Sequence, residues 1–166
     1  MYDGIINVYK EKGFTSFEVV AKMRGILGQK KVGHTGTLDP EAEGVLPVCV
    51  GKGTRLCDML TDRDKTYEAT LLLGMETDTQ DTTGTVLSET DAFGLTEEAV
   101  REAVLSFVGD YDQIPPMYSA LKVNGRKLCD LARQGGEVER KPRPVKLYDI
   151  TIRSIRLPAV VRTVSC

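Results

Sequence analysis

Apolar and polar positions follow two different periods in the first part of the chain. Residues 4–9, G-I-I-N-V-Y, have the β-branched and aromatic content of a strand. In residues 16–27 the apolar side chains recur at helical spacing. Thr15 and Glu18 form a capping box before this segment, and Gly28 follows it. The pattern therefore predicts a strand followed by a capped amphipathic helix.

The next residues predict a loop between regular elements. Residues 29–44 are basic and rich in glycine, which indicates a loop. Residues 45–50 are apolar enough for a buried strand, and a short helix is expected near residues 54–60. Alternation in residues 65–73 predicts another strand, and an acidic, threonine-rich loop follows at residues 77–84.

The second half of the chain mixes helices and strands. Residues 96–109 predict an amphipathic helix with acids in its first turn and a glycine after its end. Asn124-Gly125 is a tight-turn signal, and residues 126–134 look helical. A basic, proline-containing segment then precedes a long alternating strand at residues 145–157 and a final strand at residues 159–166.

The length of the chain and the order of these elements indicate its fold class. A chain of 166 residues fits one domain. Strands and helices mix without strict βαβ alternation, which favours an α/β or α+β fold with a mixed sheet. The last strands are expected to expose a hydrophobic edge, which favours self-association.

Composition excludes several classes of protein. The net charge is −2, so nucleic-acid binding would have to use local basic patches. Four cysteines at positions 49, 57, 129 and 166 form no C-x-x-C pair, and a single histidine cannot complete a Cys/His zinc set. No signal peptide or membrane-spanning segment is evident. We expect reduced thiols, no metal and a cytoplasmic location.

The residues most typical of a catalytic or binding loop are concentrated at positions 33–46, G-H-T-G-T-L-D-P-E-A-E-G-V-L. It contains the single histidine, His34, and a carboxylate, Asp39, followed by Pro40. Pro40 restricts the backbone of Asp39, and the nearby glycines allow a ligand to approach closely. Lys30 and Lys31 lie just upstream, so the pattern suits a carboxylate presented toward a polyanion that basic side chains hold. Without further information an Asp-Pro pair is more often a turn or a helix N-cap, and a lone loop histidine is more often structural.

A resemblance favours the first interpretation. G-H-T-G-T-L-D-P-E-A-E-G-V-L-P-V-C-V-G-K-G-T-R resembles the signature of TruB-type tRNA pseudouridine synthases. Three further segments resemble the same family in the same order. They are K-x-x-G-F-T-S at 10–16, K-T-Y-E-A-T-L-L-L-G-M-E-T-D-T-Q-D at 65–81, and Q-I-P-P-M-Y-S-A-L-K-V-N-G-R-K-L-C-D-L-A-R-Q-G at 113–135. The resemblance covers nearly the whole chain.

The resemblance implies a fold and a reaction. It implies the pseudouridine synthase catalytic fold, with a mixed, largely antiparallel sheet flanked by helices. The family isomerises one T-arm uridine of tRNA, at position 55, to pseudouridine, and it needs no cofactor, metal or obligate protein partner. Asp39 is then the catalytic carboxylate, acting as a nucleophile or as a proton acceptor. A nearby cation should keep it ionised in a pocket closed to bulk water.

The resemblance also assigns roles to other residues. His34 should lie against the flipped-out nucleotides, and Tyr67 should stack on the uracil. Asp81, Lys10 and Gly36 are expected to support the site. Without the resemblance, His34 is a packed loop residue, Tyr67 a core aromatic and Asp81 part of a solvated acidic loop. Basic residues could follow the RNA backbone or simply form solvated faces: Lys10, Lys30, Lys31, Arg126, Lys127, Arg133, Arg140, Lys141 and Arg143.

Two departures from the family pattern matter. Glu11 stands where the family usually has proline after the lysine. The chain also ends at Cys166, just before a family segment whose arginine pairs with the catalytic aspartate. Residues 1–166 are therefore expected to be a partial catalytic domain, lacking its C-terminal remainder and a PUA-type RNA-binding domain. The alternatives are a module that binds or remodels tRNA without catalysis, and a related ribonucleoprotein pseudouridine synthase.

Overall fold

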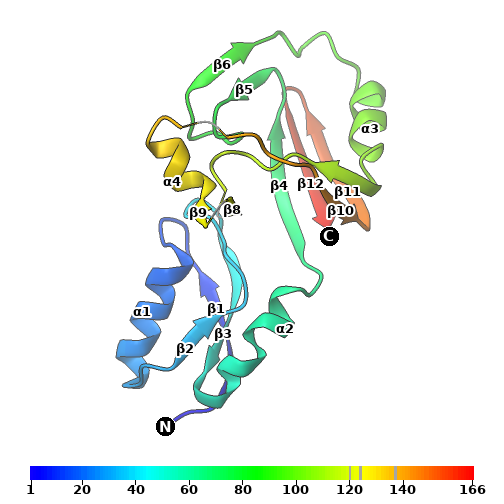
Figure 1. The fold of residues 1–166 in the computed structure, drawn as a ribbon. Coiled ribbons are helices and arrows are strands. Elements are labelled where there is room, and N and C mark those ends of the chain that lie inside the picture. Colours follow the sequence, from blue (N-terminus) through cyan, green and yellow to red (C-terminus); the bar gives the residue numbers. More distant parts are fainter. Residues whose placement is uncertain (120, 124, 137) are drawn as a thin grey trace. The chain divides into compact units, whose positions relative to one another are not determined.

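The structure is a computed structural model that describes residues 1–119, 121–123, 125–136 and 138–166. Within these ranges, the side chains of four residues lie outside the description: Lys122, Lys127, Cys129 and Arg133. The chain divides into two compact units, Met1–Arg63 and Asp64–Cys166 (Figure 1). Each unit has its own hydrophobic core.

A three-stranded antiparallel sheet forms the centre of the first unit. Its strands are β1 (Gly4–Lys10), β2 (Val32–His34) and β3 (Gly44–Val50), in the order β1-β3-β2. The strands expected at residues 4–9 and 45–50 are confirmed. The loop expected over residues 29–44 is wrong at β2, because three of its residues pair with the second half of β3.

Helix α1 (Ser16–Leu27) packs against this sheet and confirms the predicted helix. The Thr15 hydroxyl accepts a hydrogen bond from the Glu18 amide at 3.1 Å, and the Glu18 carboxylate accepts one from the Thr15 amide at 2.7 Å. Gly28 ends the helix with φ of 62°, a left-handed conformation that favours glycine. The core lies between the helix and the sheet and contains Val19, Val20, Val32, Leu46, Val48 and Val50.

Two short helical segments follow the sheet of the first unit. The 3-10 helix η1 (Gly51–Leu56) leads into α2 (Cys57–Thr61), where the sequence predicts one short helix near residues 54–60. The Thr54 hydroxyl donates a hydrogen bond to the Gly51 carbonyl at 2.8 Å. Both segments continue directly from β3, so their position depends on the end of that strand.

The second unit is built around an antiparallel sheet in the order β11-β12-β4 (Figure 1). Its strands are β4 (Thr66–Leu72), β11 (Asp149–Arg156) and β12 (Ala159–Ser165). Helix α3 (Glu97–Leu105) covers one face, and Val100 and Val104 pack against Ile150 and Val160. The final strand, β12, lies between two partners, so the expectation that the last strand exposes an edge is wrong for it. The edges of this sheet are β4 and β11.

Three two-stranded sheets and one helix complete the second unit. They are β5 (Met75–Thr77) with β6 (Val86–Glu89), β7 (Gly109–Gln113) with β10 (Arg143–Leu147), β8 (Lys122–Val123) with β9 (Arg126–Lys127), and α4 (Leu128–Arg133). The β8–β9 pair confirms the predicted tight turn at Gly125, while Asn124 lies outside the described residues. The strand expected at residues 145–157 is divided at Tyr148, since β10 pairs with β7 and β11 pairs with β12.

These elements confirm the expected α+β class. Every strand pair among the described residues is antiparallel, and the sheets are small and separate. In the part of the chain that the structure describes, no helix combines the length and hydrophobicity that crossing a bilayer requires.

Candidate functional site

The loop that carries Asp39 connects two neighbouring strands of the first unit. It leaves β2 after His34 and returns to β3 at Gly44. Thr35 begins the loop, is buried, and donates its backbone N–H to the Pro47 carbonyl at 3.2 Å. Because β2 and β3 are paired, both ends of the loop are fixed by the sheet.

His34 is half-buried and is oriented by its own loop. Its Nδ1 atom lies 2.6 Å from the Gly36 carbonyl oxygen. A carbonyl oxygen can only accept, so Nδ1 carries the proton and Nε2 points away from this contact. Gly36 has φ of 150°, a conformation that side-chain-bearing residues rarely adopt. The Gly36 carbonyl thus orients the imidazole ring of His34.

Ser16 anchors the residue that precedes Asp39. The Ser16 hydroxyl donates to the Leu38 carbonyl at 3.3 Å and accepts from the Leu38 amide at 3.0 Å. Ser16 is the first residue of α1 and is only 2% exposed. One buried hydroxyl therefore satisfies both backbone groups of Leu38.

Lys10 anchors the residue that follows Asp39. The Lys10 side chain is fully buried at the end of β1, and its Nζ donates to the carbonyls of Phe14 at 2.7 Å, Glu11 at 3.1 Å and Pro40 at 3.4 Å. The Gly13 amide donates to the same Pro40 carbonyl at 2.8 Å. A buried ammonium needs such partners, and its contacts join residues 11–14 to Pro40.

The two anchors hold the backbone on each side of Asp39 and leave its side chain exposed. The Asp39 carbonyl accepts from the Ala42 amide at 3.0 Å, which closes a turn. Among the described residues, no cationic side chain forms an ion pair with the Asp39 carboxylate. The exposed loop carboxylate expected from the sequence is confirmed as a feature of this unit.

Tyr67 and Asp81 belong to the second unit. Tyr67 lies on β4 opposite Val164 and is 40% exposed, so it is not a fully buried core aromatic. Asp81 lies in the loop between β5 and β6. One of its carboxylate oxygens accepts three hydrogen bonds: from the Thr83 hydroxyl at 2.6 Å, the Thr79 hydroxyl at 2.7 Å and the Thr83 amide at 2.8 Å. These bonds, led by the two hydroxyls, lower the pKa of Asp81.

The basic residues expected along an RNA backbone are found at several places, but this expectation is wrong for Lys10, whose side chain is fully buried. Lys30 and Lys31 are exposed just before β2. Arg126 donates to the Gln134 side chain at 2.6 Å, and Arg140 donates to the Pro115 carbonyl at 3.1 Å. Arg143 is exposed on β10, whereas the side chains of Lys127 and Arg133 lie outside the described residues.

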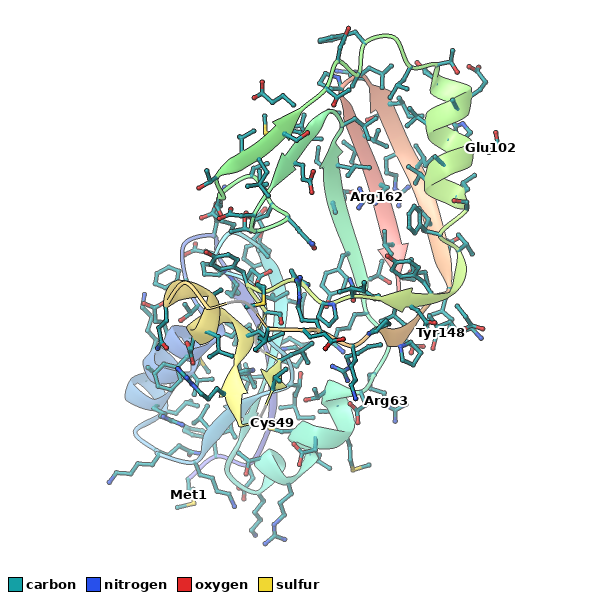
Figure 2. All side chains as sticks on the ribbon, turned by 45° about the horizontal axis from the view of Figure 1, so that its top comes forward. Met1, Cys49, Arg63, Glu102, Tyr148 and Arg162 are labelled. Atoms are coloured by element: carbon teal, nitrogen blue, oxygen red, sulfur yellow. The ribbon has the colours of Figure 1, made fainter. Side chains whose placement is uncertain are left out.

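Sequence reasoning missed Arg162 in the second unit. It lies on β12 (Figure 2), on the face that also carries Val160 and Val164. Its Nη1 atom is buried without a hydrogen-bond partner, and burial lowers its pKa. Arg162 and Asp81 line one cavity of about 520 Å³. The sequence did contain a signal for this residue, because Arg162 is a charged residue within a strand of mostly apolar residues.

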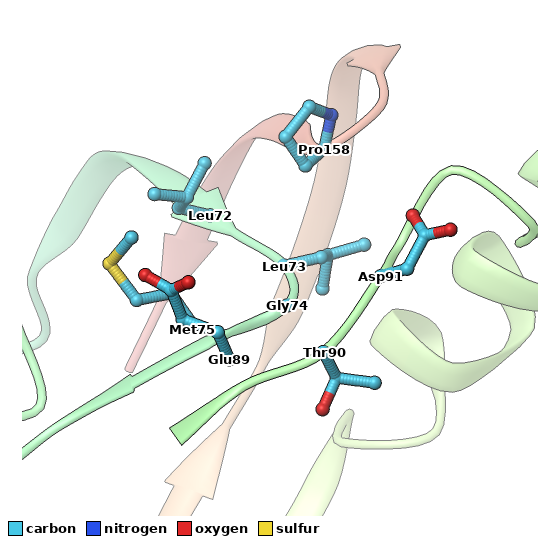
Figure 3. Close-up of a pocket in the computed structure, with 8 residues that line it drawn as sticks. All are labelled: Leu72, Leu73, Gly74, Met75, Glu89, Thr90, Asp91 and Pro158. Carbon is cyan, nitrogen blue, oxygen red and sulfur yellow. The ribbon is translucent and has the colours of Figure 1, made fainter. Parts of the chain in front are cut away.

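Another pocket of the second unit lies at the turn between β4 and β5 (Figure 3). It measures about 390 Å³ and is lined by Leu72, Leu73, Gly74, Met75, Glu89, Thr90, Asp91 and Pro158. None of the expected site residues lines it. No cluster of three or more potential metal-ligating side chains occurs in the described part of the chain.

Comparison with known proteins identifies the family of this chain. Residues 24–166 match the family model described as "TruB family pseudouridylate synthase (N terminal domain)", which places the chain among the pseudouridylate synthases. Because the match covers most of the chain, the chain belongs to the TruB family.

Two similar bacterial proteins are each named tRNA pseudouridine synthase B. The protein from Lachnoclostridium phytofermentans is 65% identical over 153 residues, covering 92% of this chain and 50% of that protein. The protein from Clostridium novyi is 52% identical over 164 residues, covering 99% of this chain and 56% of that protein. The chain thus spans about half the length of the curated relatives it matches.

A solved structure confirms the expected pseudouridine synthase fold. A chain in the structure titled "Crystal Structure of a Cbf5-Nop10-Gar1 Complex" is 32% identical, with a TM-score of 0.70. The similarity covers 98% of this chain and 39% of that chain.

Proposed function

We propose that this chain forms part of the catalytic domain of a tRNA pseudouridine synthase that acts on the T-arm uridine, with Asp39 as the catalytic carboxylate. One observation carries the proposal. Ser16 fixes Leu38, Lys10 fixes Pro40, and the carboxylate between them is exposed. Such anchoring pre-organises a reactive group, which reduces the entropy lost on reaching the reactive geometry.

The reaction requires a carboxylate and no redox partner. The bond from ribose C1′ to uracil N1 breaks, the ring turns, and C5 bonds to C1′ while the C5 hydrogen leaves as a proton. Asp39 acts either by attacking C1′ or by accepting a ribose proton, and both roles need its ionised form.

His34 and Tyr67 supply contacts to the flipped-out nucleotide in this proposal. The Gly36 carbonyl holds Nδ1 of His34 and leaves the Nε2 edge for RNA. Tyr67 offers a partly exposed ring for stacking on uracil, an interaction worth roughly 1–3 kcal/mol per base. Asp81 supports the site by ordering the β5–β6 loop, and the exposed Lys30 and Lys31 contact RNA phosphates.

Two alternatives remain distinct. A module that binds tRNA without chemistry is favoured by the absence of an ion pair at Asp39 among the described residues. A ribonucleoprotein synthase is favoured by the similarity to a chain of the Cbf5 complex. Identities of 65% and 52% to proteins named tRNA pseudouridine synthase B exceed the 32% to that chain, which supports the stand-alone tRNA enzyme.

The test is release of tritium from uracil C5 of a T-arm RNA. That hydrogen leaves only when C5 becomes the glycosidic carbon. The chain is compared with Asp39→Asn and with Asp58→Asn, which removes another exposed carboxylate of the same unit. We expect release by the wild type and Asp58→Asn alone.

Release by Asp39→Asn would overturn the catalytic role of Asp39. If no protein releases tritium while all three bind the RNA, the chain acts as a binding module. RNA binding is measured by fluorescence anisotropy of the same labelled stem-loop.

A further inference from the structure

Two cysteines of the first unit occupy one face of its sheet. Cys49 lies on β3, is fully buried, and pairs with Gly33 on β2 (Figure 2 labels Cys49). Gly33 has no side chain, and the Cys57 sulfur fills the space above it. A Cβ atom added at Gly33 would lie 3.3 Å from Cys57 Sγ.

This arrangement brings the two thiols together. Directly opposed residues of an antiparallel pair have Cβ atoms roughly 4.5–5.5 Å apart on the same face of the sheet. The Cys57 sulfur lies where the Gly33 Cβ would point, so it adjoins the side chain of Cys49. The neighbouring Cys57 thiol also contributes, after burial, to the raised pKa of Cys49.

The two thiols differ in access and reactivity. Cys57 is half-buried at the start of α2, within reach of a small oxidant. Cys49 is enclosed, and burial together with its contact to Cys57 raises its pKa to about 11. The thiolate is the reactive form of cysteine, so Cys57 reacts first and Cys49 second.

We propose that Cys49 and Cys57 form an oxidative modification site that closes to a disulfide under a hydroperoxide. The Cys57 thiolate attacks the terminal peroxide oxygen, the O–O bond breaks, and a sulfenic acid forms; the departing hydroxide or alkoxide takes up the proton that the thiol had released and leaves as water or an alcohol. Cys49 then attacks that sulfur, its proton leaves with the hydroxyl as water, and the S–S bond forms. The two sulfurs together lose two electrons, and the peroxide gains them.

The disulfide ties β3 to the start of α2 beside Gly33, the residue that precedes His34. It closes a short loop over residues 49–57 and restricts the unfolded chain, which raises the thermal stability of the first unit. A thiol reductant reverses the change. This inference does not depend on the proposed catalytic activity.

The test uses Cys129→Ser/Cys166→Ser, which retains only this pair of cysteines. The protein is treated with hydrogen peroxide, denatured, alkylated and digested with trypsin. Trypsin cuts after Lys31, Lys52, Arg55 and Arg63, so Cys49 and Cys57 fall in the separate peptides 32–52 and 56–63. We expect these two peptides to be linked before reduction and to separate after it.

Two further variants test the role of each cysteine and show whether a negative result comes from misfolding. In the background of Cys129→Ser/Cys166→Ser, Cys49→Ser should leave a Cys57 sulfenic acid that dimedone traps. Cys57→Ser should leave Cys49 unoxidised, and circular dichroism checks both folds. Independent alkylation of both thiols after peroxide treatment, or sulfinic acid at Cys57 without any link to Cys49, would overturn the proposal.

Discussion

The two loops that carry the candidate carboxylates are held in different ways. The backbone around Asp39 is anchored by Ser16 and Lys10, whose contacts span 22 and 30 residues of sequence. The Asp81 carboxylate is held by Thr79 and Thr83, each two residues away. Both aspartates are largely exposed, but only the first depends on the packing of a whole unit.

The Asp39 loop is therefore positioned by contacts with distant residues, whereas the Asp81 loop is held by hydrogen bonds within its own turn. A change at Lys10 or Ser16 should alter the stability of the first unit and the Asp39 loop together. A change at Asp81 should alter the stability of little beyond its own turn, since the partners of its carboxylate lie within that turn. Losses of stability should therefore be larger for changes at Lys10 and Ser16 than for a change at Asp81.

Lys10→Met should have the largest effect on stability. It removes a buried ammonium that satisfies three carbonyls, while the methionine fills a similar volume. The Glu11 and Phe14 carbonyls lose this donor, whereas the Pro40 carbonyl keeps the Gly13 amide, and the free energy of unfolding should fall by about 2–4 kcal/mol. Urea unfolding followed by circular dichroism measures this change.

Lys12→Met is the matched control for Lys10→Met. Lys12 forms an exposed ion pair with Glu41 at 2.8 Å, and exposed pairs contribute little. We expect no measurable loss of stability. Equal losses for the two variants would contradict the anchoring role of Lys10.

Ser16→Ala should lower the free energy of unfolding by about 1–3 kcal/mol, because the Leu38 amide loses its acceptor. Thr15→Ala, which removes only the helix cap, should cost about 1 kcal/mol. Hydrogen exchange separates the two effects. The Leu38 amide should exchange faster in Ser16→Ala and remain protected in Thr15→Ala, and faster exchange in both would argue against a specific anchor.

Gly36→Ala should cost about 1 kcal/mol, because alanine is strained at the φ of 150° found there. The strain should shift the Gly36 carbonyl away from His34. Nitrogen NMR of the imidazole reports this change. A proton on Nδ1 is expected in the wild type and a mixture of tautomers in the variant, whereas identical spectra would show that Gly36 does not orient the ring.

The smallest effect concerns the acid stability of the second unit. The pKa of Asp81 is lowered in the folded state, so its contribution is present above the unfolded pKa of about 3.9 and is lost as pH falls through the folded pKa. Because Asp81 is mostly exposed, the contribution should stay below about 1 kcal/mol. The free energy of unfolding should fall less between about pH 6 and about pH 3 in Asp81→Asn than in the wild type. The same pH profile for both proteins would contradict this contribution of Asp81.

Local signals in the sequence predicted helices α1 and α3, strands β1, β3, β4 and β12, and the region of β10 and β11, but they missed β5, β6, β7 and β9. The Thr15–Glu18 capping box and Gly28 define α1, because these caps act within one turn of the chain. Strand β2 was missed because three residues next to glycine become a strand only through pairing with β3. The break at Tyr148 was also missed, since the alternation continues across it while the strand partner changes.

The candidate site could be predicted only in part. The segment around Asp39 and its exposure follow from the loop composition and the family resemblance. The contacts of Lys10 and Ser16 with that loop could not be read from local pattern, because they join residues that meet only after α1 packs on the sheet. The buried Nη1 of Arg162 likewise depends on how β12 lies between its neighbours.

The most direct test compares the two carboxylates in one assay. Release of tritium from uracil C5 in a T-arm RNA is measured for Asp39→Asn and Asp81→Asn beside the wild type. The account predicts complete loss of release for Asp39→Asn and reduced but measurable release for Asp81→Asn. Release by Asp39→Asn at the wild-type rate would contradict the central claim that the anchored carboxylate of the first unit performs the reaction.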